Sequence, residues 1–320
     1  MPTLSRKAKQ FLIALAKLLV VGGAFYFIYD RIANNEQMDW KRFTEMLAGQ
    51  NSLPLIIVVL SLTFLNRFIE ILKWQNLAST IRPLSVAMAT EQVLAALTAA
   101  LFTPNGIGEY AAKTLYFKKS DAKNVVFLNL ICNGVQLIIA VFFGLAGLLI
   151  FNALYDVIPT RTLIIILVVI IAVVAIVFTS RKITIRGYSI QKLGNKINEL
   201  PKRVHRKTGL LAICRYLCIM HQHYFIFLAF GVELPYPIMI SAIAGVYFLG
   251  SSLPSFQLLD FAVRGSVAVF FFGILGVNEW IVVFAATLQW LLNIVIPVTI
   301  GSYFVFRFKP SNITEPTVQD

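Results

Sequence analysis

Long apolar stretches alternate with short polar segments along the whole chain. A helix needs about 20 mostly apolar residues to cross the hydrocarbon core of a bilayer. Stretches of this kind lie at 11–29, 53–75, 124–151, 161–179, 209–230 and 280–306. They predict six full transmembrane helices, and the polar residues 310–320 predict a disordered tail.

Two further apolar segments are interrupted. Residues 84–117 are apolar as far as Phe102, where the sequence TPNGIG breaks the pattern, and residues 238–277 are broken at Pro254. Because proline removes a helical hydrogen bond and glycine loosens a helix, each segment is expected to form two half-helices. We therefore predict two re-entrant helical hairpins and an all-α integral membrane protein.

The composition supports a membrane protein. Apolar residues make up 58% of the chain and charged residues 13%, whereas a soluble domain is about 45–50% apolar. A net charge of +13 is compatible with nucleic-acid binding, but the basic residues lie in short runs between apolar stretches. That distribution is typical of loops facing an anionic leaflet, so we expect no nucleic-acid partner.

The positions of lysine and arginine predict the orientation. If each hairpin enters and leaves on one side, most basic residues fall on a single face, including Lys73 and the run from Arg181 to Lys207. Cytoplasmic loops are rich in these residues. We predict cytoplasmic N- and C-termini in a cell membrane, a bacterial inner membrane being the expected one. The remaining basic residues are Arg31, Lys41, Arg42 and Arg161 on the opposite face, and Lys17, Arg67, Lys113, Arg215 and Arg264 at membrane depth.

The same layout predicts an internal repeat. A span, a hairpin and a span occur in order over residues 53–151, and the same order recurs with reversed direction over residues 209–306. The span at 161–179 and a basic cytoplasmic loop at 180–208 join the two repeats within one polytopic domain, 1–320. Apolar residues in the loop approximate a helical stripe, so the loop is either an interfacial helix on anionic lipid or a solvated basic linker. The stripe consists of Ile190, Leu193, Ile197 and Leu200. Interrupted helices at matching positions of two inverted halves are typical of the midplane site of a transporter.

Each interruption is followed by an acid and, four residues later, a base. The pairs are Glu109 with Lys113 and Asp260 with Arg264, and the spacing places each pair on one helix face. In one hypothesis, the half-helix N-termini after Pro104 and Pro254 and the two cations bind an anionic headgroup. In the other, the pairs are structural clasps that neutralise charges which are costly at bilayer depth.

Other polar residues lie within the predicted spans. Arg67 and Glu70 could line the same cavity or extend toward the interface, and Arg215 presents the same two alternatives. Two helical stripes of amides favour hydrogen bonding between helices over substrate contact. The stripes are Asn129, Asn133 and Gln136 in one span, and Gln289 and Asn293 in another.

The sequence contains no known catalytic motif. His221 and His223 are two residues apart on a predicted helix and face different directions, so they form a poor metal site. We expect no metal, no cofactor and no enzymatic activity of the soluble kind.

The sequences LNRFIEILKWQNLA and TPNGIGEYAAK, with the second proline break, resemble the flippase-like membrane domain of the lysylphosphatidylglycerol synthase (multiple peptide resistance factor) family. The resemblance covers nearly the whole chain and implies two inverted repeats with re-entrant helices. The family's P-x-G-x-G-E motif corresponds to Pro104, Gly106, Gly108 and Glu109, with Lys113 at the position of a base. In the second motif only Pro254 and the acid match, because residues 255–259 replace the glycines and Asp260 replaces glutamate.

The resemblance implies movement of a lipid between leaflets. The soluble aminoacyl-transfer domain of the family is absent from this sequence, so lysyl transfer is not expected. The leading hypothesis is a flippase that binds lipids with polar or anionic headgroups, with a homo-oligomer left open. The alternatives are a membrane-embedded transferase, or an accessory subunit of one, and a transporter of small ions or solutes that uses Glu109 and Asp260.

Overall fold

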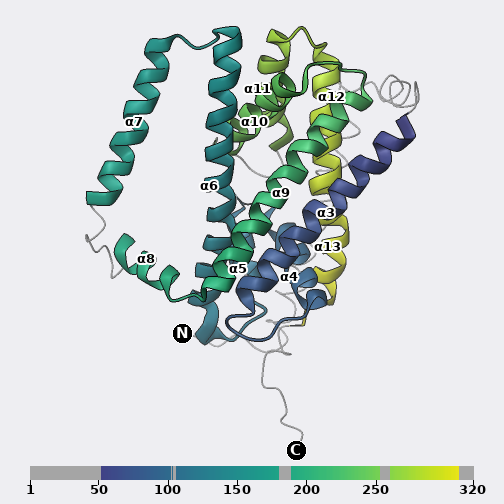
Figure 1. The fold of residues 1–320 in the computed structure, drawn as a ribbon. Helices are drawn as coiled ribbons and strands as arrows, with labels where there is room; N and C mark the ends of the chain where they lie inside the picture. The colour runs from purple at the N-terminus through teal and green to yellow at the C-terminus, as the bar shows by residue number, and fades with distance from the viewer. Residues whose placement is uncertain (1–51, 102, 104–105, 180–188, 253–259, 310–320) are drawn as a thin grey trace, which may run out of the picture.

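The computed structural model describes residues 52–101, 103, 106–179, 189–252 and 260–309, and every regular element within these ranges is helical (Figure 1). Four helices are long and apolar enough to cross a membrane: Leu53–Ala78, Lys119–Tyr155, Lys202–Ala229 and Glu279–Arg307. They confirm long apolar helices at four of the predicted spans. The span predicted at 161–179 is helix α7 (Thr160–Thr179), and the one at 11–29 lies outside the described residues.

The outward faces of the long helices expose large apolar side chains. Phe64, Ile138 and Phe142 are each more than two-thirds exposed. In water such a surface would be unstable, whereas lipid is as apolar as these side chains. This distribution agrees with an all-helical membrane protein.

The first interrupted segment forms two helices, as predicted. After α3 (Ser52–Ala78) come α4 (Val86–Ala100) and the short α5 (Ile107–Thr114), and the chain breaks between them at the TPNGIG sequence. A 3₁₀ turn at Lys119–Asp121 leads into α6 (Ala122–Tyr155).

The second half has the same order of elements. It consists of α9 (Lys202–Ala229), α10 (Tyr236–Ser252), α11 (Asp260–Ile274) and α12 (Glu279–Trp290). A π-helical turn, η4 (Leu291–Val295), joins α12 to α13 (Ile296–Arg307). The predicted interruption falls between α10 and α11, and Pro254 itself lies outside the described residues.

The basic connection between the halves contains a helix over most of the predicted apolar stripe. Helix α8 (Ile190–Asn198) begins after Ser189, whose hydroxyl accepts a hydrogen bond from Lys192 N. Ile197 and Leu200 pack against the core of the first half. Helix α9 begins at Lys202, before the expected start at 209, because lysine and arginine are good helix formers and let the apolar helix extend into the basic segment.

The most extensive packing between the halves, within the described residues, involves three helix pairs. Helices α3 and α9 contact each other and run diagonally side by side through the centre of Figure 1. Helix α6 packs on α10, and α13 packs on α4. A glycine lies in each of the last two contacts: a Cβ at Gly147 would overlap Ala244 and Ser241, and one at Gly301 would overlap the Leu94 carbonyl. Larger residues would force these helices apart.

Candidate functional site

The break between α4 and α5 is stabilised by the chain itself. Gly106 has a positive φ of 70°, which favours glycine, and precedes the first residue of α5. The Thr103 hydroxyl donates to Ala100 O (2.9 Å) and accepts from Gly108 N (2.8 Å), and Glu109 N donates to Gly106 O (3.0 Å). Two N–H groups predicted to face a headgroup therefore already have partners. Pro104 lies outside the described residues.

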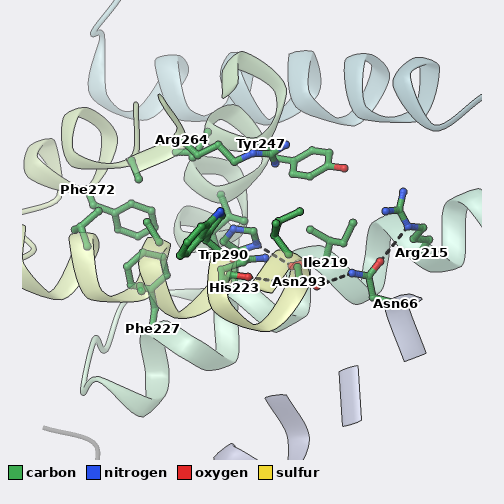
Figure 2. Close-up of a pocket in the computed structure, with 18 of the residues that line it drawn as sticks. Asn66, Arg215, Ile219, His223, Phe227, Tyr247, Arg264, Phe272, Trp290 and Asn293 are labelled. Atoms are coloured by element: carbon green, nitrogen blue, oxygen red, sulfur yellow. Dashed lines mark hydrogen bonds between the residues drawn. The ribbon is translucent and has the colours of Figure 1, made fainter. Parts of the chain in front are cut away.

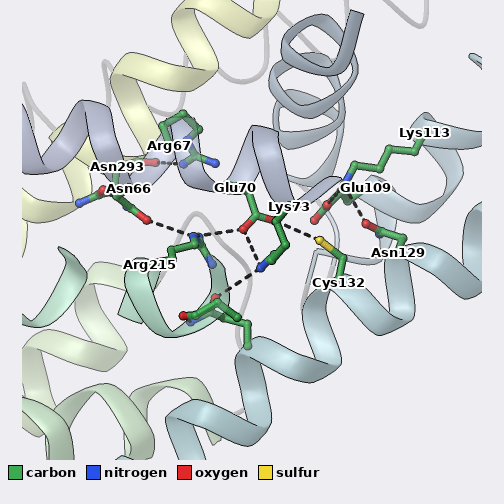
Figure 3. Close-up of polar contacts among 12 residues, drawn as sticks. Asn66, Arg67, Glu70, Lys73, Glu109, Lys113, Asn129, Cys132, Arg215 and Asn293 are labelled. Atoms are coloured by element: carbon green, nitrogen blue, oxygen red, sulfur yellow. Dashed lines mark hydrogen bonds and ion pairs between the residues drawn. The ribbon is translucent and has the colours of Figure 1, made fainter. Parts of the chain in front are cut away.

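The first acid–base pair is enclosed by protein. Lys113 is fully buried, and its Nζ forms an ion pair with Glu109 and donates to Asn129 Oδ1 at 2.7 Å. The same ammonium lies 4.1 Å from the centre of the Trp74 ring. With these contacts Lys113 has the geometry expected of the clasp hypothesis (Figure 3).

Glu70 is the centre of a second buried network, which Figure 3 shows beside the first. Its carboxylate forms ion pairs with Lys73 Nζ (2.9 Å) and Arg215 Nε (3.1 Å). Lys73, placed at the cytoplasmic face by the sequence analysis, is instead fully buried and also donates to Gln136. The reason is its spacing, because a base three residues after a buried acid lies on the same helix face.

A chain of amides connects this network to the second half of the molecule. Arg215 Nε donates to Asn66 Oδ1 (3.0 Å), and Asn66 Nδ2 donates to Asn293 Oδ1 (2.7 Å). Asn293 Nδ2 donates to Gln222 Oε1 (3.0 Å). The predicted role of the amide stripes in hydrogen bonding between helices is confirmed here for Asn293.

The hydrogen bonds in this chain of amides all run in one direction, from donor to acceptor. Gln222 Nε2 donates to Thr63 Oγ1 (2.6 Å), and the Thr63 hydroxyl donates to Val59 O (2.8 Å). A guanidinium can only donate and a backbone carbonyl can only accept. The series of hydrogen bonds starts at the Arg215 guanidinium and ends at the Val59 carbonyl. Every amide between them therefore has one allowed orientation.

Arg67 is bound to a carbonyl that lacks its usual helical donor. Its Nη2 donates to Asn293 O at 2.6 Å. In an α-helix the N–H four residues later would bond this carbonyl, but that residue is Pro297, which has no N–H. The π turn at Leu291–Val295 lies at the same place, and such turns are frequent at functional sites.

A cavity of about 140 Å³ lies where α3 meets α9, α10, α11 and α12 (Figure 2). Its volume is roughly ten times the minimum for one water molecule. Arg67, Arg215 and Arg264 line it, and none of the lining residues within the described ranges is acidic. Aromatic and amide side chains complete the wall, among them Phe227, Tyr247, Phe272, Gln289, Trp290 and Asn293.

The bases of the two predicted acid–base pairs differ in their relation to the cavity. The Arg264 guanidinium lies 4.9 Å from the centre of the Tyr247 ring and faces the cavity, whereas Lys113 is not among the lining residues. Asp260 is the first residue of α11, and its side chain lies outside what the structure describes. Of the predicted site residues, Arg67 and Arg264 meet in the cavity, and Glu70 reaches it indirectly through Arg215.

Sequence reasoning missed two cavity residues that are not charged. Asn66 precedes Arg67 on α3, and His223 lies on α9. A polar residue inside an apolar span is a usable signal, and each of these has that property.

No protein-family model matches the chain, and no curated protein matches it significantly.

Proposed function

We propose that this protein moves lipids with anionic headgroups between the two leaflets of a membrane, and that the headgroup binds in the three-arginine cavity. The acyl chains would remain in the bilayer, because the cavity has room for a headgroup alone. The proposal agrees with the resemblance to the flippase-like family, which we also infer.

Arg67 is the observation that supports this function best. A charged arginine at the centre of a membrane helix costs at least ~2.5–3.5 kcal/mol. Arg67 has no ion pair with any described residue, and its Nε is buried without a hydrogen-bond partner there. An anion bound beside Arg67 would neutralise this charge.

We also propose the inverted repeat, with re-entrant hairpins α4–α5 and α10–α11 and cytoplasmic termini. The packing supports it, because exchanging the halves converts the contact of α6 with α10 into that of α13 with α4. The close-packed glycines exchange in the same way, Gly147 for Gly301. The cavity would then lie at the junction of the repeats.

The test is lipid movement in proteoliposomes that contain a labelled anionic phospholipid, with Arg67→Gln as the main variant. Glutamine still has an N–H that can donate to Asn293 O but has no charge. A charge-assisted hydrogen bond contributes about 1.5–3 kcal/mol, so we expect the rate to fall roughly tenfold to a hundredfold. Arg67→Lys should retain most of the activity.

Arg203→Gln is the matched control, since Arg203 is an exposed arginine near the start of α9. It should move lipid at the wild-type rate. Equal movement of anionic lipid by folded wild-type and Arg67→Gln protein would contradict the proposed site. Uptake of inorganic phosphate without lipid movement would instead indicate a transporter of small anions.

A further inference from the structure

The cavity contains hydrogen-bond acceptors as well as cations. Gln289 lines it, and Gln289 Oε1 is buried without a partner among the described residues. An unsatisfied buried acceptor is costly unless a ligand supplies a donor. A phosphate, which offers mainly acceptors to the protein, does not satisfy this atom.

The orientation of Gln289 follows from the hydrogen-bond chain. Gln222 Nε2 donates to Thr63, so Gln222 Oε1 is the acceptor atom of that amide. Gln289 therefore turns its own Nε2 toward Gln222 Oε1, at 3.4 Å. Its carbonyl oxygen is left without a donor among the described residues, and rotating the amide would place two acceptors face to face.

His223 supplies a second acceptor. It lines the same cavity, and its Nδ1 is 2.9 Å from Ile219 O. Because that carbonyl can only accept, Nδ1 donates, and a neutral imidazole then presents Nε2 as an acceptor. In Figure 2, His223 and Trp290 lie between the polar end, at Arg215 and Asn66, and the apolar end, at Phe227 and Phe272.

We propose that the anionic group bound here is a phosphate ester whose headgroup carries hydroxyl groups, as in a glycerol or sugar phosphate. The arginines would hold the phosphate, while Gln289 Oε1 and His223 Nε2 would accept from the hydroxyls. Ammonium headgroups also have donors, but the Arg67 guanidinium, which has no ion pair with a described residue, repels their charge. This inference rests on the proposed anion-binding cavity and specifies its substrate.

The test uses three soluble headgroups and the detergent-solubilised full chain. Glycerol phosphate and propyl phosphate share a three-carbon chain and a phosphate charge, and differ only in two hydroxyls; ethanolamine phosphate adds an ammonium. Calorimetry should find glycerol phosphate bound roughly tenfold to a hundredfold more tightly than propyl phosphate, the range expected for one or two hydrogen bonds. Ethanolamine phosphate should bind more weakly than glycerol phosphate.

The double variant Gln289→Met with His223→Phe removes both acceptors and keeps similar side-chain volume. It should bind glycerol phosphate as weakly as wild type binds propyl phosphate, while its affinity for propyl phosphate stays unchanged. His221→Phe is the control, because His221 lies on the same helix but bonds Tyr236 and is not among the cavity residues. It should keep the wild-type preference.

Proteoliposomes separate this inference from the proposed function. Phosphatidylglycerol and phosphatidylpropanol differ by the same two hydroxyls, and wild type should move the first faster. Equal affinity for glycerol phosphate and propyl phosphate, or an unchanged preference in the double variant, would overturn the inference. If phosphatidylglycerol and phosphatidylpropanol move at the same rate, the inference about hydroxyl groups is overturned, whereas the flippase function is still supported. Selective binding without lipid movement would support the inference and refute the flippase function.

Discussion

The bases that follow the two breaks have different described neighbours. Lys113 is enclosed by Glu109, Asn129 and Trp74, whereas Arg264 lies against Tyr247 and faces the cavity. Both motifs have the same spacing, so spacing alone cannot distinguish a clasp from a binding residue.

Lys113→Met tests the clasp. Removing one partner of a buried pair leaves an uncompensated charge on Glu109, so we expect a loss of about 3–5 kcal/mol in the free energy of unfolding. The double variant Glu109→Gln with Lys113→Met should lose clearly less free energy of unfolding than Lys113→Met alone. Unfolding equilibria in mixed detergent micelles measure both. If the losses of stability measured for Glu109→Gln alone and Lys113→Met alone add up to the loss of the double variant, the two residues act separately.

The sequence predicted part of the candidate site. Arg67, Glu70 and Arg264 were identified because charges in apolar spans are rare. Lys73 was assigned to the cytoplasmic face because it lies near the end of its span, although its spacing from Glu70 pointed inward. The contact of Arg67 with Asn293 joins residues 226 positions apart, and no local pattern reveals such a pairing.

At the scale of elements, proline and glycine predicted where the helices break. The sequence could not predict how the break is stabilised, because Thr103 acts through its side chain across the turn. The π turn before Pro297 was missed for a related reason. Proline predicts a missing hydrogen bond, but the extra residue per turn depends on packing against α3.

Glycine-to-alanine substitutions test the break between α4 and α5. At Gly106 the left-handed conformation costs an L-residue roughly 1–2 kcal/mol. At Gly108 a Cβ would lie about 3.0 Å from the Thr103 side chain and closer still to the Ala99 carbonyl, so a similar or larger loss of stability is expected. Gly209→Ala is the control, since a Cβ there meets nothing within 4 Å and α9 should gain roughly 0.5–1 kcal/mol.

These stabilities can be measured by the same unfolding equilibria. Lipid movement should fall for Gly108→Ala and remain unchanged for Gly209→Ala. A stable and fully active Gly108→Ala protein would mean that the close approach of α5 to α4 is not required.

At the scale of the whole molecule, hydropathy predicted the order of helices but not their contacts. Helix α3 packs on α9 across the two halves, and the polar side chains of both helices meet at that contact. Apolar periodicity could not predict this pairing, because in lipid the outward and inward faces are both apolar. The buried polar residues were the better guide to the interior.

The topology is tested by labelling single cysteines in intact and permeabilised cells with a membrane-impermeant reagent. Ser79→Cys and Lys123→Cys flank the first hairpin at exposed positions, and Glu233→Cys and Glu279→Cys flank the second. If both hairpins are re-entrant, the members of each pair react from the same side, the first pair from the cytoplasm and the second from outside. Gln191→Cys on α8 should react from the same side as the first pair, because α9 crosses the membrane between Gln191 and Glu233.

Cells expressing the unmodified chain give the background from its three native cysteines, which lie within α6 and α9. If Ser79→Cys and Lys123→Cys react from opposite sides, the first hairpin crosses completely, and the inverted repeat and its cavity at the junction of two halves are wrong.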